Sequence, residues 1–205
     1  MKKGLLLVLL AVIGVLAWYF LVTKRKPKEE VVKDRPVAVS HHSQAFNQSI
    51  DTFLNSYYGL TEALVNWDST TVTTTANQMN QALANVKWTE LQRDTAIYQT
   101  ATSYTDIFKN DISVLSGTAN LTEKRHAFHS LSQNLYDMLR TIKYDKAKLY
   151  LQQCPMAFNE TEEGLWLSKT EKIRNPYLGL HHPKYKSGMI SCGETKDTLN
   201  FQGKD

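Results

Sequence analysis

The chain has 205 residues, of which 42% are hydrophobic and 21% charged, with only 9 Gly and 5 Pro. This composition excludes a disordered chain and a fibrous repeat, and the length suits one packed domain with an appendage. The formal net charge is +4, but residues 1–35 hold 8 Lys/Arg and 3 Asp/Glu, which leaves 16 basic and 17 acidic residues in the remainder. A nearly neutral body offers no basic face for phosphates, so we expect no nucleic-acid partner.

The N-terminus has the pattern of a membrane anchor. Residues 4–22 (GLLLVLLAVIGVLAWYFLV) are 19 uncharged and almost wholly apolar residues, which as a helix rise roughly 28 Å, about one hydrocarbon core. A cleaved signal peptide usually has an apolar region of about 7 to 15 residues followed by a small-x-small site, and neither condition is met. We therefore expect a single-pass transmembrane anchor over residues 1–23 and a charged, proline-containing tether over residues 24–41.

The basic residues that flank this segment give a separate prediction of orientation. Two lysines precede the apolar run, whereas Lys24, Arg25, Lys26 and Lys28 follow it. By the positive-inside count alone, the body would be cytoplasmic.

Four stretches of the body have the apolar spacing of amphipathic helices, at intervals of three and four residues. They lie within residues 42–67, 72–86, 97–115 and 121–142. Asp68 is placed to cap the second helix, Thr89 and Gln92 form a capping-box pattern before the third, and Gly117 follows its end. Four helices joined by short polar turns predict a mainly α fold, an antiparallel four-helix bundle.

The character of the sequence changes after residue 144. Two short, partly alternating stretches, KLYLQQCPMAF and GLWLS, are separated by the polar NETEE, and the rest is rich in Pro, Gly, Tyr and His. This pattern predicts short β-strands in an otherwise irregular C-terminal segment that packs on the bundle. Helices and tail together form one predicted domain over residues 42–205.

Both cysteines lie in this tail, and each has a methionine within three positions. Cys154 precedes Met156 by two residues, and Met189 precedes Cys192 by three. Thiolates and thioethers are soft donors that suit a thiophilic ion, so these four sulfurs are candidate ligands for Cu(I) and, less favourably, Ag(I). The spacing does not match the usual zinc patterns.

The residues alone leave a second interpretation of the cysteines open. A disulfide between Cys154 and Cys192 would close a loop of 38 residues and stabilise the tail outside the cytoplasm. In either case Pro155 would stiffen the first turn, and Gly188 and Gly193 would allow the second segment to approach closely.

The histidines provide a further set of candidates. His181 and His182 precede Met189 in a loop and are possible additional ligands or pH-sensing groups. His126 and His129 are spaced to share one face of the fourth helix, and we expect them to be exposed.

Signatures of catalysis are absent from the sequence. It contains no G-x-S-x-G elbow, phosphate-binding loop, G-x-G-x-x-G fingerprint or H-E-x-x-H motif. We therefore expect no catalytic residues and predict that the protein is not an enzyme.

The tail motifs in combination resemble the DUF3347 family. They are CPMAF at 154–158, WLS at 166–168, IRNPY at 173–177, and Met189 with Cys192-Gly193-Glu194. The pattern Arg125-x-x-Phe128-x-x-Leu131-Ser132 and the stretch YYGL at 57–60 also resemble this family, so that the resemblance runs from about residue 46 to residue 194.

The resemblance implies a context that the residues alone do not give. Family members are bacterial, common in Bacteroidetes, and occur alone behind an N-terminal signal or anchor or fused to periplasmic adaptor subunits of copper and silver efflux systems. It therefore implies an inner-membrane protein with its body in the periplasm, against the positive-inside count, and heavy-metal efflux components as partners.

The resemblance also bears on the candidate site. The family motifs coincide with the four sulfurs of Cys154, Met156, Met189 and Cys192, which favours metal binding over a disulfide. It implies that residues 175–177 (Asn175, Pro176 and Tyr177) form a turn that presents the second ligand segment. Residues 180–188 (LHHPKYKSG) are longer than the link in fused members, and this difference adds His181 and His182.

Overall fold

The computed structural model describes residues 42–202 and, nearer the N-terminus, Val15, Leu16, Trp18 and Tyr19. These two parts belong to separate compact units. The residues Val15, Leu16, Trp18 and Tyr19 are helical and exposed. The rest of the predicted anchor (1–23) and the whole of the predicted tether (24–41) lie outside the described residues. Within the described part of the chain, no helix combines the length and apolar character needed to cross a membrane.

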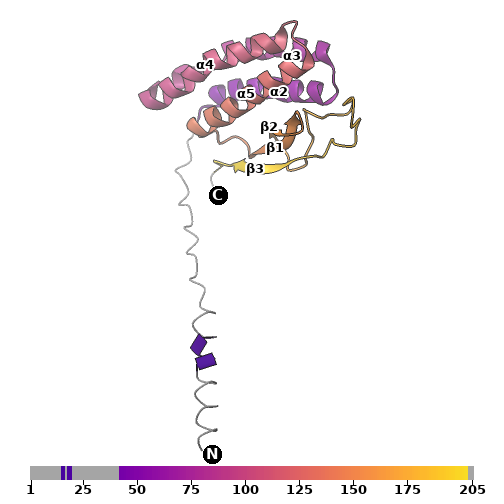
Figure 1. The fold of residues 1–205 in the computed structure, drawn as a ribbon. Helices are drawn as coiled ribbons and strands as arrows, with labels where there is room; N and C mark the ends of the chain where they lie inside the picture. Colours follow the sequence, from indigo (N-terminus) through magenta and orange to yellow (C-terminus); the bar gives the residue numbers. More distant parts are fainter. Residues whose placement is uncertain (1–14, 17, 20–41, 203–205) are drawn as a thin grey trace, which may run out of the picture. The chain divides into compact units, whose positions relative to one another are not determined.

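The body is mainly helical, as the sequence predicted, with a small antiparallel sheet at its C-terminal end (Figure 1). Its α-helices in the described residues are α2 (Gln44–Val65), α3 (Ser69–Ala84), α4 (Thr95–Ser116) and α5 (Leu121–Thr141), with a 3₁₀ helix η1 (Trp88–Arg93) between α3 and α4. Helices that are neighbours in sequence pack on one another.

Polar caps fix where these helices begin. The Asp68 carboxylate accepts a hydrogen bond from the Thr71 amide at the start of α3, as predicted. At α5, the Asn120 side chain accepts from the Glu123 amide while the Glu123 carboxylate accepts from the Asn120 amide, which completes a capping box. These caps satisfy amides that have no partner within the helix.

The predicted capping box at Thr89 and Gln92 is wrong. Both residues lie within η1, and α4 begins later, at Thr95, where Asp94 caps the Ile97 amide at 3.0 Å. Asp94 is an equally good cap by residue type and stands directly before the apolar repeat. The tighter η1 turns absorb the residues that the sequence pattern assigned to the helix start.

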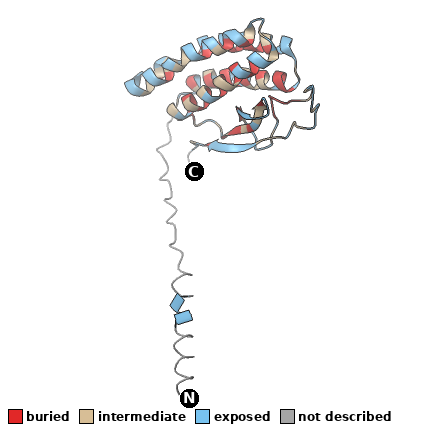
Figure 2. Ribbon diagram, in the orientation of Figure 1, coloured by how far each residue is buried: buried red, intermediate tan, exposed pale blue. Residues whose placement is uncertain are grey.

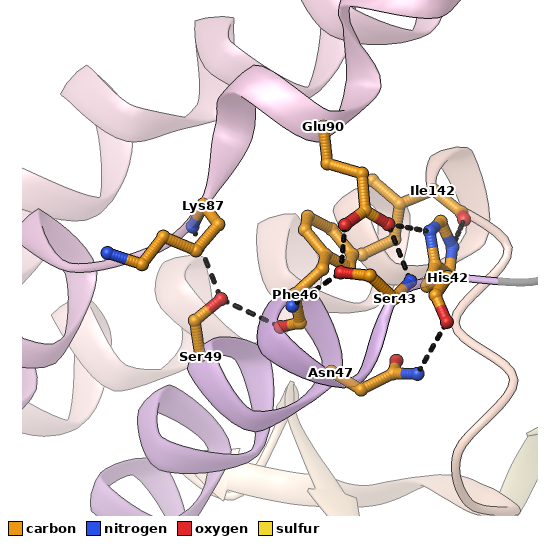
Figure 3. A network of polar contacts seen from close by, with 8 residues as sticks. All are labelled: His42, Ser43, Phe46, Asn47, Ser49, Lys87, Glu90 and Ile142. Carbon is orange, nitrogen blue, oxygen red and sulfur yellow. Dashed lines mark hydrogen bonds and ion pairs between the residues drawn. The ribbon is translucent and has the colours of Figure 1, made fainter.

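A polar network holds the first described residues of the body in place (Figure 3). His42 Nε2 lies 2.7 Å from the Ile142 carbonyl oxygen, and its Nδ1 lies 3.5 Å from Glu90 Oε1. The Ser43 amide donates to the same carboxylate at 2.8 Å, while Ser43 Oγ accepts from the Phe46 amide as the cap of α2. The start of α2 is thereby joined to η1 and to the end of α5.

The apolar faces of the helices form the core, and their polar faces point outward (Figure 2). Aromatic contacts join non-neighbouring segments: Tyr57 of α2 stacks on Phe128 of α5 at 5.2 Å between centroids, and Phe53 packs on Phe108 of α4 at 5.6 Å. These fully buried rings are the residues that the three- and four-residue spacing placed inside.

The sheet contains β1 (Leu149–Phe158), β2 (Glu162–Ser168) and β3 (Glu194–Leu199), in the order β2-β1-β3 with antiparallel pairing throughout. The first two strands are the predicted hairpin, and its turn is made by Asn159 and Glu160, both with positive φ. β3 was not predicted, because its first five residues (ETKDT) are polar and exposed on a sheet edge. The Leu167 amide of β2 donates to Tyr57 Oη at 2.9 Å, which ties the sheet to α2.

Candidate metal site

The fold brings the two cysteines of the tail together. Cys154 lies on β1, the central strand, and Cys192 lies in the loop just before β3. The β1–β3 ladder runs to the pair Gln153 and Glu194, so Cys192 sits directly beyond the end of the ladder. The two Sγ atoms are 3.9 Å apart, and neither cysteine is in a disulfide.

A glycine makes this approach possible. Gly193 has φ of +136°, a conformation that residues with a Cβ rarely adopt. A Cβ at this position would lie 2.4 Å from the Gln153 carbonyl oxygen and 3.1 Å from the Trp166 ring. The chain can therefore pass this closely beside β1, and place Cys192 next to Cys154, only with glycine here.

Asn175 fastens the Cys192 segment to the rest of the domain. Its side chain is fully buried, and its Nδ2 donates to the Cys192 carbonyl oxygen at 2.8 Å. Its backbone amide donates to the Ile190 carbonyl oxygen at 2.8 Å. Its Oδ1 accepts from the amides of Tyr177 and Leu178, which closes an Asx turn. One buried side chain thus shapes the turn and holds the second cysteine segment.

The turn of residues 175–177 is anchored on the helices. Arg125 of α5 donates from Nε to the Pro176 carbonyl oxygen at 3.2 Å and from Nη2 to the Leu64 carbonyl oxygen at 3.1 Å. Its guanidinium also lies 4.0 Å from the centroid of the Trp67 ring. Tyr177 is buried and donates from its hydroxyl to the Leu165 carbonyl oxygen in β2. The turn is therefore fixed to α2, α5 and the sheet.

The two cysteines differ in exposure and in acidity. Cys154 is fully buried, whereas Cys192 is partly exposed. Burial, together with the nearby Cys154, raises the pKa of the Cys192 thiol to about 11. Cys192 is consequently a thiol at neutral pH, and any ion that binds it as a thiolate must displace a proton.

The methionines lie in the same two segments as the cysteines. Met156 follows Cys154 on β1, where the register with β2 shifts between Cys154 and Phe158. The Met189 carbonyl oxygen accepts from the Cys192 amide at 3.0 Å, which forms the turn before Gly193. Both side chains are partly buried against the hydrophobic core. Among the side-chain atoms of these four residues, the structure describes a contact between the two cysteine sulfurs.

The two loop histidines differ in how they are held. His182 Nδ1 accepts from the amides of Lys184 and Tyr185, each at 3.2 Å, and its ring packs 5.5 Å from Trp67. Burial, with the positive charges of Arg125 and Lys184, lowers the pKa of His182. His181 is exposed. The described side-chain hydrogen bonds of His182 shape its own loop. Within residues 42–202 no cluster of three or more His, Cys, Asp or Glu side chains could hold a metal ion.

The prediction that both helix histidines are exposed is wrong for one of them. His126 is exposed and stacks on Phe158 at 3.9 Å between centroids. His129 is half-buried, and its Nδ1 accepts from the Leu165 amide at 3.0 Å. Helix spacing alone could not show that β2 packs over α5 at this position. His129 therefore joins the sheet to the helices.

Sequence reasoning missed Trp67 as a support of the tail. This residue lies two positions after the end of α2 and has φ of +59°. Its Nε1 donates to the Leu178 carbonyl oxygen at 3.0 Å. Gly179 lies against it, where a Cβ would be 2.7 Å from Trp67 Nε1. The available signal was a tryptophan at the end of the first apolar repeat, directly before the cap residue Asp68.

Comparison with known proteins finds one family for this domain, whose helices precede a small antiparallel sheet. Residues 53–147 match the family model DUF3347, described as a protein of unknown function. This match confirms the resemblance to the DUF3347 family over α2 to α5. It ends before Cys154, so it does not extend to the sulfur-bearing tail. No curated protein and no solved structure matches the chain.

Proposed function

We propose that this protein binds a soft monovalent metal ion, Cu(I) in preference to Ag(I), between Cys154 and Cys192. The observation that carries the proposal is the 3.9 Å separation of the two sulfurs. Two thiolates at about 2.3 Å from one ion are roughly 3.8 to 4.0 Å apart in tetrahedral or trigonal geometry. The side chains thus already have the spacing of a two-sulfur metal site.

The type of donor supports the choice of ion. Soft thiolate and thioether ligands select Cu(I) over hard cations such as Mg²⁺ or Ca²⁺. Met156 and Met189, one in each cysteine segment, are the nearest further soft donors in sequence, and a thioether from either would complete a three-sulfur site. In this proposal the ion is cargo that the protein captures.

The cellular setting belongs to the same proposal. The apolar N-terminal segment would hold the protein in the inner membrane with its body in the periplasm, where captured Cu(I) would pass to heavy-metal efflux components. The support is the apolar run of residues 4–22 and the context of efflux systems that the resemblance to the DUF3347 family implies.

The proposal is tested by competition with a chromogenic Cu(I) chelator, using the reduced full-length protein in detergent under anaerobic conditions. The expected result is one Cu(I) per chain, with affinity at least about 100-fold weaker in Cys154→Ser and in Cys192→Ser, because loss of a ligand should exceed the 10- to 100-fold effect of losing a second-shell partner. The matched control is Ser191→Ala, an exposed change beside Cys192. Unchanged affinity in both cysteine variants would overturn the proposal.

The alternative is an envelope protein-interaction module in which the two cysteines form a structural disulfide. The same short distance between Sγ atoms favours it, since a small movement would allow the bond to form. Thiol counting separates the two functions: a permanently oxidised pair that resists reduction and takes up no metal would support the alternative.

A further inference from the structure

We propose that Cys154 and Cys192 form a reversible thiol–disulfide switch that closes the metal site when oxidised. This inference rests on the proposed function for its consequence, because metal uptake is the property that the switch controls. Its chemistry rests on the fold, which places the two sulfurs 3.9 Å apart.

The first step of the argument is the distance that must be closed. The sulfurs are 3.9 Å apart, whereas a disulfide has a sulfur–sulfur distance of about 2.05 Å. The pair therefore lies about 2 Å from bonding distance, within the reach of a side-chain rotation combined with a small backbone shift. No rearrangement of the helices is needed.

The second step concerns which cysteine moves. Cys154 is fully buried on the central strand, with β2 and β3 on either side, so its position is fixed by the sheet. Cys192 lies in a loop beyond the end of the β1–β3 ladder. Its segment is held by two hydrogen bonds from Asn175, to the carbonyl oxygens of Cys192 and Ile190, and is followed by Gly193. The loop can therefore carry Cys192 towards Cys154 while the sheet stays in place.

The third step is the chemistry of oxidation by a small disulfide such as oxidised glutathione. Cys192 is the partly exposed cysteine, so its thiolate attacks one sulfur of the small disulfide, forms a mixed disulfide and releases one small thiol. The thiolate of Cys154 then attacks Cys192 Sγ, the mixed disulfide breaks, and the second small thiol leaves. The two protons of the protein thiols end on the two released thiols, so the protein is oxidised by two electrons and the small disulfide is reduced.

The fourth step is the effect on metal binding. A disulfide has no thiolate, and the thiolate is the form of cysteine that binds metal. Oxidation would remove both anionic ligands together and leave only thioethers in the two segments.

The test equilibrates the full-length protein, metal-free and anaerobic, in glutathione buffers of graded oxidised-to-reduced ratio, and counts free thiols by alkylation and mass spectrometry. We expect both thiols to disappear together over one transition and to return on adding dithiothreitol. The oxidised protein should bind Cu(I) at least about 100-fold more weakly than the reduced protein, since both ligands are lost. A pair that stays reduced in the most oxidising buffer, or stays oxidised in dithiothreitol, would overturn the switch.

Single variants test the order of attack. Cys154→Ser should accumulate a glutathione adduct on Cys192, whereas Cys192→Ser should leave the buried Cys154 largely unmodified in the folded protein. Equal adducts on both would overturn the assigned order. The thiol counts need no copper, so a reversible transition in a protein that binds no Cu(I) when reduced would refute the proposed function while leaving the redox pair established. Equal Cu(I) affinity in the two redox states would refute the control of binding.

Discussion

At the scale of single residues, the candidate site depends on a few residues, each of which supplies a different chemical or conformational property. Gly193 supplies a backbone conformation, Asn175 supplies a buried amide, and the two cysteines supply the sulfurs. Each of these residues was visible in the sequence as a candidate. What the sequence could not show was that Asn175 binds the carbonyl group of Cys192 itself.

Replacing Gly193 with alanine should destabilise the protein by about 1 to 3 kcal/mol, because φ of +136° is strained for any residue with a Cβ and that atom would meet the Gln153 carbonyl oxygen. Urea unfolding followed by circular dichroism measures this change. Gly188→Ala is the matched control, since its Cβ would come no closer than 3.2 Å to another atom and its φ is not positive. Equal effects of the two variants would contradict the role of Gly193.

Replacing Asn175 with alanine should cost about 2 to 4 kcal/mol of stability, because the Cys192 carbonyl group and two buried amides lose their partner. The Cys192 segment should also loosen, so Cu(I) affinity should fall even at temperatures where the variant remains folded. Asn80→Ala, at an exposed position of α3, should change stability by no more than about 0.5 kcal/mol. A stable Asn175 variant with normal Cu(I) affinity would show that the hydrogen bonds of Asn175 are not needed to hold the Cys192 segment.

The apparent affinity for Cu(I) should rise with pH. Because burial raises the pKa of Cys192 to about 11, this thiol is almost wholly protonated between pH 6 and pH 9 and must release its proton on binding. The affinity, corrected for protonation of the competing chelator, should therefore increase at least about tenfold per pH unit between pH 6 and pH 9. Cys192→Ser should reduce this slope by one proton. A flat profile for the unmodified protein would exclude Cys192 thiolate as a ligand.

At the scale of elements, hydrophobic periodicity located all of the α-helices in the described body, because each buries one apolar face. Periodicity failed where local geometry or pairing decides the structure. The 3₁₀ helix η1 displaced the predicted start of α4, and β3, whose residues are nearly all polar, is held by its pairing with β1 rather than by burial. The hairpin of β1 and β2 was predictable because its strands are apolar and its turn is polar.

Arg125 joins the helices to the tail, so a change at this residue should lower the stability of the protein. Lysine at this position cannot form the two separate bonds of the guanidinium or stack on Trp67 in the same way, so Arg125→Lys should destabilise the protein by about 1 to 3 kcal/mol. Arg93→Lys, at an exposed position of η1, is the matched control and should be nearly neutral. Thermal unfolding of both variants measures the difference. Equal melting temperatures would show that the turn of residues 175–177 does not depend on Arg125.

At the scale of the whole molecule, the helices and the tail have different proposed roles. The DUF3347 match covers the helices over residues 53–147, and the two cysteines follow it on the sheet and its connecting loop. In our account the helices are the scaffold: α2 and α5 hold the turn that places Cys192 beside Cys154. In the proposed function, the metal ion binds beside the C-terminal sheet, between Cys154 and Cys192.

The measurement that tests this account most directly is X-ray absorption at the copper edge, on the reduced full-length protein loaded with one equivalent of Cu(I). The account predicts a shell of at least two sulfur neighbours at about 2.3 Å, which is lost in the double variant Cys154→Ser, Cys192→Ser. A copper shell made of nitrogen or oxygen neighbours, or a sulfur shell that persists in the double variant, would contradict it.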